Sequence, residues 1–249
     1  MFVKDRTLPL FTVRFLKIAC ICFLPLICLP SCGAAKPAED PADQQWQALL
    51  GENAQKQWRG YGKEGWPEGW KLEEGILHRH AGGGDLMTVG KFANFELRLE
   101  WKISPKGNSG IMYRVSKGDE AAYFSGPEYQ ILDDSDHKDG KNDKTSAATL
   151  YALYAQSGGK LRPVGKWNKT RIVVAGNHVQ HWLNDQKVVE FEIGSPDWNE
   201  RVAKSKFAEW PNFGKNKPGH IVLQDHGDPV WYRNIQVRSL KHSSHQTPV

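Results

Sequence analysis

The stretch "FELRLEWKI", residues 95–103, decides the fold class of this 249-residue chain. Every second residue is apolar, from Phe95 to Ile103, and charged residues fill the positions between them. Successive side chains of a β-strand point to opposite faces, so this alternation creates one apolar and one polar face. A period of two with a single apolar face predicts a half-buried antiparallel strand.

Similar alternating runs recur along the chain, separated by Gly, Asn, Asp or Pro. The further candidate strands are 75–80, 110–115, 128–133, 170–176, 178–184, 187–193, 220–225 and 234–240. Turn signals at Gly176–Asn177 and Asn184–Asp185 predict two successive hairpins. Helical patterns are scarce, and short helices are expected only within 43–53 and 197–210. Many short strands without alternating helices predict an all-β sandwich or jelly roll with few short helices.

Residues 1–31 have the form of an export signal. Four Lys or Arg residues lie within residues 1–17, and the apolar run "IACICFLPLICLP" that follows is too short for a comfortable membrane span. The run ends in "LPSC" (29–32), which resembles the lipobox of bacterial lipoproteins, where the Cys becomes the lipidated first residue. We therefore expect an exported, membrane-anchored lipoprotein, periplasmic or outer-membrane, with its lipid on Cys32. An ordinary signal cleaved nearby is the alternative.

Cysteine usage and charge narrow the class of protein. All four cysteines lie at or before Cys32, so the mature chain can form no disulfide and no thiolate metal site. Removing residues 1–31 leaves 29 Lys and Arg against 27 Asp and Glu, which lowers the formal charge from +5 to +2. A nucleic-acid-binding domain would show a clustered basic face, so no nucleic-acid partner is expected.

The remaining chain is predicted to form one domain. Residues 32–45 form a short polar linker, residues 46–240 form the β-sandwich, and residues 241–249 form a C-terminal tail. The 218 residues after the signal are enough for one large all-β domain, and no internal repeat or second linker interrupts them.

Polar and aromatic side chains recur on the second face of four predicted strands. In "EYQILD" (128–133) Tyr129 and Ile131 share the apolar face, so Glu128 and Gln130 point the opposite way. The same rule on the neighbouring runs adds Arg114, Trp182, Gln224 and His226. Together they supply hydrogen-bonding groups for hydroxyls and an aromatic plane for C–H faces, which suits a sugar. The alternative is an ordinary solvated face, with Arg114 and Glu128 as an exposed ion pair of little energetic value.

Five stretches, taken in order, resemble the 3-keto-disaccharide hydrolase domain family. They are "WRGYGKEGWPEGWKLEEGILH" (58–78), "NFELRLEWKISPKGNSGIMYRV" (94–115), "GPEYQILDD" (126–134), "WNKTRIVVAGNHVQHWLND" (167–185) and "IVLQDHGDPVWYRNIQVRSL" (221–240). The resemblance covers about residues 55–240. It implies a concanavalin A-like jelly roll, in agreement with the strand pattern, and family members are commonly exported lipoproteins.

The resemblance also implies cleavage of glycosides already oxidised at C3 of the sugar. A C3 ketone acidifies the C2–H, and the enolate can expel the C1 substituent. Water can then add to the eliminated product, so that elimination followed by hydration gives net hydrolysis. A lyase that stops after the elimination needs the same catalytic groups. Such a site needs a base, an electrophile for the enolate and an acid for the leaving oxygen.

The residues expected to fill these roles come from the predicted polar face. Glu128 and His226 are the expected base and acid, in either order, and Arg114 is the expected enolate stabiliser. The expected substrate contacts are Asn108, Gln130, Asp133, Tyr151, Trp182 and Gln224.

Two alternatives stay open at this stage. A divalent metal held by Glu128, Asp133 and His226 could replace Arg114 as the electrophile, and the sequence does not decide between the two. The chain could also be a non-catalytic carbohydrate-binding envelope lipoprotein that uses the same groove.

Overall fold

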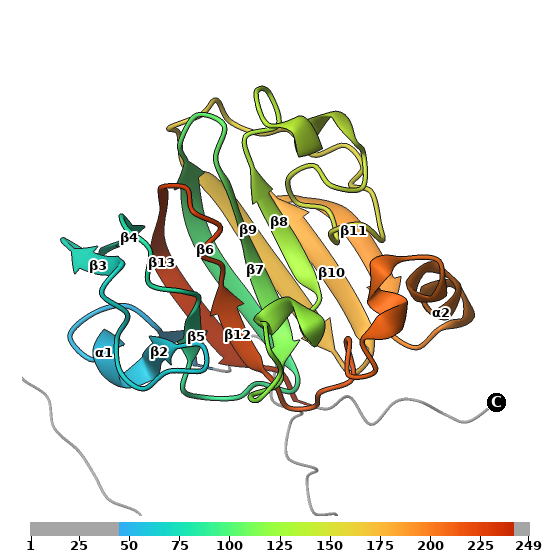
Figure 1. Cartoon of the computed structure of the whole chain (residues 1–249), viewed down its shortest axis with the longest axis horizontal. Coiled ribbons are helices and arrows are strands. Elements are labelled where there is room, and N and C mark those ends of the chain that lie inside the picture. The colour runs from blue at the N-terminus through green and yellow to red at the C-terminus, as the bar shows by residue number, and fades with distance from the viewer. Residues whose placement is uncertain (1–44, 242–249) are drawn as a thin grey trace, which may run out of the picture. The chain divides into compact units, whose positions relative to one another are not determined.

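The computed structural model describes residues 45–241, and in this range two antiparallel sheets pack face to face (Figure 1). The large sheet has the strand order β11-β10-β9-β6-β13-β4-β3, with β1 paired to β13, and the small sheet has the order β2-β5-β12-β7-β8. The predicted all-β sandwich is confirmed.

The strands are short, as the spacing of the turn signals predicts. The large sheet consists of β1 (Gln47–Ala48), β3 (Trp70–Glu73), β4 (Ile76–Arg79), β6 (Phe95–Ile103), β9 (Asn168–Ala175), β10 (His178–Leu183), β11 (Gln186–Glu192) and β13 (Val230–Ser239). The small sheet consists of β2 (Trp58–Gly60), β5 (Leu86–Thr88), β7 (Asn108–Val115), β8 (Glu128–Leu132) and β12 (His220–Leu223). The alternating stretch "FELRLEWKI" forms β6 in full.

Helices are few and short in the described residues. The α-helices are α1 (Ala54–Gln57) and α2 (Pro196–Ala203), and the 3₁₀-helices are η2 (Ala122–Phe124), η3 (Lys138–Lys141) and η4 (Lys206–Glu209). The helical pattern within 197–210 is confirmed by α2 and η4. The expected helix within 43–53 is wrong, because Gln47 and Ala48 instead pair with Val237 and Gln236 of β13, and the helix begins only at Ala54.

Both predicted hairpins are present. Strands β9 and β10 turn at Gly176–Asn177, and strands β10 and β11 turn at Asn184–Asp185. Asn184 and Asp185 have φ angles of 47° and 71°, which matches the preference of two-residue hairpin turns for Asn and Asp.

The main core lies between the two sheets. Leu97, Leu99 and Trp101 of β6 lie in one buried cluster with Tyr129 and Ile131 of β8. The Trp101 indole donates a 2.9 Å hydrogen bond to Thr170 Oγ1, so its polar atom is satisfied inside the core. The parity of β8 is therefore as predicted, and Glu128 and Gln130 point away from the core.

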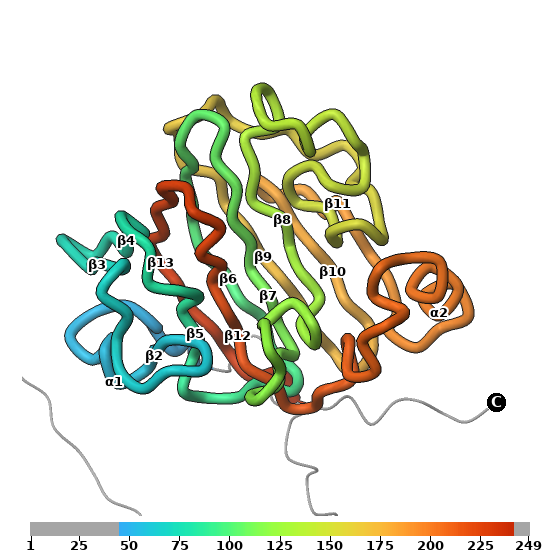
Figure 2. The backbone as a smooth tube through the Cα atoms, viewed as in Figure 1, coloured from blue at the N-terminus to red at the C-terminus, as the bar shows by residue number. Residues whose placement is uncertain are grey.

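The opposite face of the small sheet is also covered. A smaller buried cluster of Met87, Met112, Val115, Ala122 and Val222 lies on that side. The segment after β8 pairs along the free edge of β8, where Tyr151 N donates to Glu128 O at 3.0 Å, and the Tyr151 side chain reaches the same face. In Figures 1 and 2 the short helix η2 lies in front of the lower ends of β7 and β8, and the segment after β8 lies beside β8. A polar residue on this face therefore borders a partly covered hollow instead of a flat, fully solvated surface.

One departure from the predicted alternation occurs at the end of β7. Arg114 has a φ of 55°, and the pairing of β7 with β12 shifts register between His220 and Val222. This bulge moves Val115 into the smaller cluster beside Met112, so the predicted face of Val115 is wrong.

Several sequence predictions concern residues outside the described range. The signal peptide, Cys32, the linker up to residue 44 and the tail from residue 242 all lie there. Among residues 45–241, no helix has the length and apolar character needed to span a bilayer.

Candidate active site

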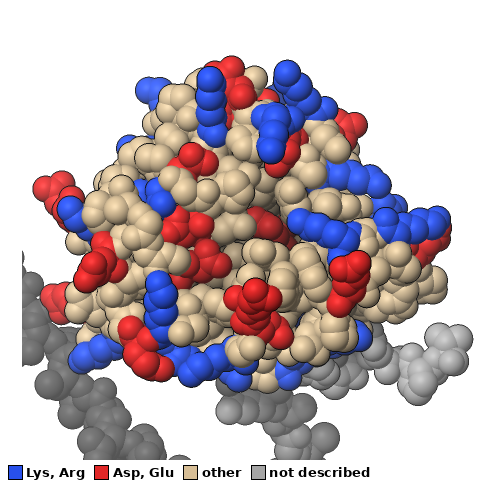
Figure 3. Space-filling view, in the orientation of Figure 1, with Lys and Arg blue, Asp and Glu red and all other residues tan. Residues whose placement is uncertain are grey.

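A cavity of about 420 Å³ lies on the covered face of the small sheet. In Figure 3 the middle of this face is hollowed, with Asp and Glu atoms inside the hollow and basic side-chain atoms at its rim. Six of the predicted site residues line the cavity: Asn108, Glu128, Gln130, Tyr151, Gln224 and His226. Seven residues that were not predicted complete the lining: Tyr123, Phe124, Gly126, Asp139, Lys206, Phe207 and Trp210.

Glu128 lies in the floor of this cavity, at the start of β8. Its backbone pairs with Met112 of β7, and its side chain passes over Gly110, the next outward-facing position of β7. Only 9% of the residue is exposed. Burial raises the pKa of the Glu128 carboxyl to about 8; the charge of Lys206 opposes this shift and that of Asp85 adds to it. The carboxyl is therefore poised to exchange a proton near neutral pH.

Amide groups form one end of the cavity, which we call the polar end. Asn108 and Gln130 come from β7 and β8, and Gln130 Nε2 donates to Asn108 Oδ1 at 3.4 Å. Gln224 follows β12, and its buried Oε1 has no hydrogen-bond partner among the described residues. An unsatisfied buried acceptor is unfavourable by about 1–3 kcal/mol, so a hydroxyl donor from a ligand would stabilise the site.

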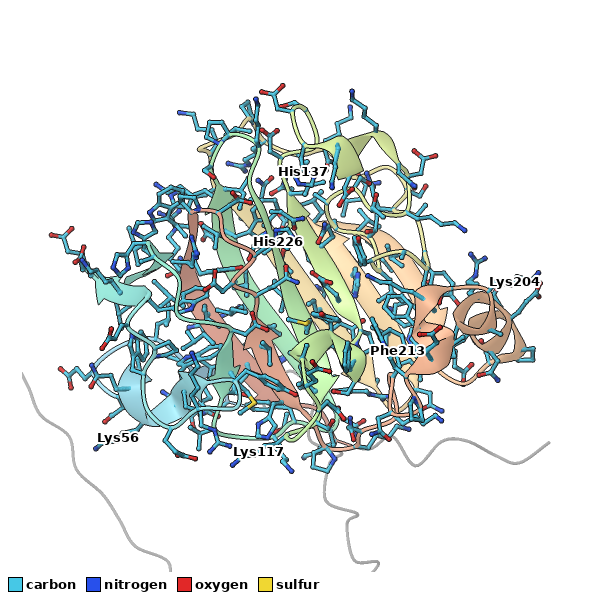
Figure 4. All side chains as sticks on the ribbon, in the orientation of Figure 1. Lys56, Lys117, His137, Lys204, Phe213 and His226 are labelled. Carbon is cyan, nitrogen blue, oxygen red and sulfur yellow. The ribbon has the colours of Figure 1, made fainter. Side chains whose placement is uncertain are left out.

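His226 completes the polar end from the loop after β12. Its imidazole is half exposed, and Nδ1 lies 4.0 Å from Asp228 Oδ2. Figure 4 shows His226 in front of the small sheet, above the middle of the view. Asp228 also accepts a 3.0 Å hydrogen bond from Asn108 N, which ties this loop to β7.

Asp225 holds the loop that carries Gln224 and His226. Its carboxylate accepts a 2.6 Å hydrogen bond from Arg79 Nε and further bonds from the amides of Gly83 and Gly84. Both side chains of the Arg79–Asp225 pair are largely buried. These bonds join the loop to Arg79 of β4 and to the segment between β4 and β5.

The opposite end of the cavity, which we call the aromatic end, is built from η2 and the segment around η4. The ring of Phe124 lies 4.6 Å from that of Trp210, and the ring of Tyr123 lies 5.5 Å from it. Phe207 stacks on Phe213 at 4.1 Å, which anchors this wall to the core. Phe213 lies well below His226 in Figure 4.

Lys206 places a cation beside Glu128 at the aromatic end. Its Nζ lies 4.7 Å from the ring centroid of Tyr151 and 5.9 Å from that of Trp210. Its charge favours the ionised form of Glu128. An ammonium held over aromatic rings next to a buried carboxyl can donate a proton or stabilise an oxyanion.

Arg114 does not reach the cavity. The bulge directs its guanidinium to the other end of the sandwich, where Nη1 donates to Gly214 O at 3.1 Å and Nη2 donates to Gly176 O in the β9–β10 turn. Its predicted place on a shared face with Glu128 is wrong, because the left-handed residue breaks the alternation on which that prediction rests.

Trp182 and Asp133 also lie elsewhere. Trp182 has the predicted parity, but β10 belongs to the large sheet, so its indole lies on the far face of the sandwich with the Arg171 guanidinium 3.8 Å from the ring centroid. Asp133 borders a different cavity and accepts hydrogen bonds from Lys106 N and Ser135. Their predicted convergence with Glu128 is therefore wrong.

The donor set does not fit the metal site considered from the sequence. Glu128 and His226 line the same cavity, but Asp133 does not. Within residues 45–241 no three His, Cys, Asp or Glu side chains come together in a group that could hold a metal ion. We therefore derive no chemical step through a metal.

The fold and the cavity together define a class of protein: a β-sandwich with an amide-rich pocket around a buried carboxyl of raised pKa, which is suited to proton chemistry on a polyhydroxy ligand. The chain belongs to the family of 3-keto-alpha-glucoside-1,2-lyase-like domains, whose model matches residues 45–238. The predictions of this family and of a glycoside-cleaving enzyme are confirmed.

Two similar proteins support this family assignment, and a third supports the fold. A 3-keto-disaccharide hydrolase of Bacteroides thetaiotaomicron is 39% identical over 215 residues, which cover 74% of this chain and 74% of that protein. A candidate glycosyl hydrolase from Parabacteroides distasonis is 31% identical with a TM-score of 0.74, covering 82% of this chain and 98% of its own. A Bacillus subtilis protein with a galectin-like fold is 11% identical with a TM-score of 0.53, covering 80% and 96%. The last supports the jelly-roll fold alone, which agrees with the prediction.

Proposed function

We propose that this protein cleaves glycosides whose sugar carries a ketone at C3, by removing the C2 proton and eliminating the C1 substituent. Membership of the family and the similarity to a 3-keto-disaccharide hydrolase support the substrate class. Among the observations on this chain, the buried carboxyl of Glu128, with a pKa near 8, carries the proposal.

Glu128 acts as the base in this proposal. The C3 ketone makes the C2–H acidic, and a base is most effective when its pKa lies near the working pH. Glu128 takes the proton, and the electrons of the C2–H bond form the enolate of C2, C3 and the C3 oxygen. When the C3 ketone re-forms, the C1–O bond breaks with its electron pair leaving on the oxygen, and a C1–C2 double bond remains.

The polar end holds the sugar and its C3 oxygen. The amide N–H groups of Asn108 and Gln130, together with His226, are donors for an oxygen on which negative charge develops. Gln224 Oε1 accepts from a hydroxyl of the sugar, which removes the unsatisfied acceptor. His226 is placed for this role by the loop that Asp225 anchors.

Lys206, which the sequence analysis did not predict, is the acid in this proposal and lies beside Glu128. In the proposal its ammonium meets the departing C1 oxygen and protonates it. Water then adds across the double bond, with its hydroxyl at C1 and its proton at C2, which gives net hydrolysis. A protein that releases the unsaturated sugar before water adds is a lyase with the same site.

The test uses the purified chain with a 3-keto-glucoside carrying a chromogenic aglycone. We expect aglycone release, a slower rate when C2 carries deuterium, and at least a 100-fold loss in Glu128→Gln, in keeping with the usual contribution of a general base. Binding of the sugar with no aglycone release above the rate in buffer alone would contradict the proposal. An unchanged rate of release in Glu128→Gln would show that Glu128 is not the base.

The proposed location is the cell envelope, with the chain attached to the membrane through lipid on Cys32. The motif "LPSC" that ends the apolar run supports this proposal. Cells fed an alkyne fatty acid should label the full-length chain, and Cys32→Ser should not be labelled. Equal labelling of the two chains would overturn the proposal.

A further inference from the structure

The cavity is chemically divided along the direction of β7 and β8. Asn108 and Gln130 lie on one side of Glu128, because β7 and β8 run antiparallel with Gly110 opposite Gln130 and Met112 opposite Glu128. The residues of η2 immediately precede β8 and lie on the other side. Glu128 therefore stands at the boundary between amide groups and aromatic rings.

The aromatic end presents apolar surface to solvent at the cavity mouth. Among the described residues, three large hydrophobic side chains are exposed, and Tyr123, at 39%, is the only aromatic ring of the three. It lies at 5.1 Å from Phe124 and 5.5 Å from Trp210, so the three rings form one surface. Exposed aromatic surface beside a polar pocket is typical of a ligand-binding subsite.

The chemistry of the substrate fixes which part of it meets this surface. The ring hydroxyls and the C3 oxygen of a keto-sugar need hydrogen-bond partners, and Asn108, Gln130 and Gln224 supply them at the polar end. C1 is bonded to C2, whose proton goes to Glu128. The C1 substituent therefore extends away from the polar end, past Lys206, and onto the rings.

Resting on the function proposed above, we infer that the aromatic end is the subsite for the departing group. It selects C1 substituents with a flat apolar face, of which an aryl ring is the best fit, and Trp210 is its specificity-determining residue. Offset stacking between rings 4.5–7 Å apart adds to the binding of a flat group but contributes nothing for a methyl group.

The experiment compares 4-nitrophenyl and methyl 3-keto-glucosides in the wild type, Trp210→Ala and Trp210→Phe. The intrinsic reactivity of the two leaving groups cancels when the ratio of their kcat/KM values is compared between variants. We expect the aryl-to-methyl ratio to fall roughly three- to tenfold in Trp210→Ala, as the loss of one stacked pair implies. Trp210→Phe keeps a ring and should retain most of the preference.

Trp182→Ala is the matched control, because its indole lies on the far face of the sandwich, outside the cavity. Its aryl-to-methyl ratio should equal that of the wild type. An equal fall for both substrates in Trp210→Ala would place the keto-sugar itself on the rings and overturn the inference. An unchanged ratio would overturn it as well.

A binding measurement separates this inference from the proposed function. In Glu128→Gln, calorimetry should show tighter binding of the aryl than of the methyl 3-keto-glucoside, and the additional Trp210→Ala change should remove the difference. A wild type that releases neither group contradicts the proposed function. Equal affinities for the two glycosides contradict the aromatic subsite, whatever the outcome of the release assay.

Discussion

A Cβ atom on Gly110 would lie 1.9 Å from Glu128 Oε1 and 2.7 Å from its Cδ. The carboxyl of Glu128 thus occupies the space that a side chain at position 110 would fill. The strand can carry a carboxyl flat against its own sheet only because its neighbour on β7 is a glycine.

Gly110→Ala should displace Glu128 and lower kcat by at least tenfold while the sandwich stays folded. The displaced groups are near the end of a flexible side chain, so the carboxyl moves before the backbone does. Gly82→Ala is the matched control, since nothing lies within 4 Å of a Cβ there. Release of the chromogenic aglycone and circular dichroism measure the two effects. A fully active Gly110→Ala enzyme would contradict the assigned position of Glu128.

The rate should depend on pH through the ionisation of Glu128. Burial raises the pKa of this carboxyl to about 8, and a base works in its ionised form. We therefore expect kcat/KM to rise with pH and to level off above about pH 8. A profile that falls through the same pH would show that the protonated carboxyl is the active form, which would make Glu128 the acid.

The free energy of unfolding should decrease as pH rises, because Glu128 holds its proton more tightly in the folded chain than in the unfolded chain. The pKa of Glu128 is about 8 in the folded chain against an ordinary value of 4.5, so the folded state binds the extra proton between these values. The contribution of Glu128 to the free energy of unfolding is fully present below pH 4.5 and is lost as pH rises through about 8. Glu128→Gln removes the ionisation, so its free energy of unfolding should exceed that of the wild type by a few kcal/mol at pH 9. At pH 4 urea unfolding should show little difference, and a constant difference at both pH values would contradict the shifted pKa.

Lys206→Met should slow the release of poor leaving groups more than good ones. An alkoxide needs a proton as it departs, whereas a nitrophenolate leaves without one. We expect a loss of at least 100-fold for the methyl glycoside and less than tenfold for the nitrophenyl glycoside, read from kcat. Lys204→Met is the control, because Lys204 pairs with Glu200 on the exposed side of α2. Equal losses for both substrates would remove Lys206 as the proton donor.

Arg114→Met should affect folding and not catalysis. The change removes the donors to the half-buried Gly176 O and the buried Gly214 O, and a buried carbonyl without a partner is unfavourable by about 1–3 kcal/mol. We expect a lower thermal midpoint and a kcat per folded molecule within about twofold of the wild type. A large loss of kcat without loss of stability would return Arg114 to the active site.

Those site residues whose direction follows from the alternation of apolar and polar residues along one strand could be predicted from the sequence. Tyr129 and Ile131 enter the core, so Glu128 and Gln130 face the cavity as expected. Gln224 follows from the same argument on β12. The argument fails for Arg114, because a single residue with positive φ reverses the faces beyond it.

The alternation of apolar and polar residues shows which way a side chain points, but it does not show which of the two sheets the strand joins. Trp182 faces away from the core as expected, yet β10 lies in the large sheet. Lys206 and Trp210 were missed because the position of a short segment after α2 depends on tertiary packing. The nearest sequence signal is the pair of aromatic residues within "KFAEW" (206–210), which is unusual in an exposed helical stretch.

The two walls of the cavity have separate origins in the chain. The polar end comes from strands whose other faces build the core, whereas η2 and η4 lie on top of the sheet in segments that add no strand. Substitutions of the ring residues Tyr123 and Trp210 can therefore alter which glycosides are accepted, while Lys206, Glu128 and the sandwich beneath them stay in place. In evolutionary terms, substrate range can diversify on this scaffold while the reaction stays the same.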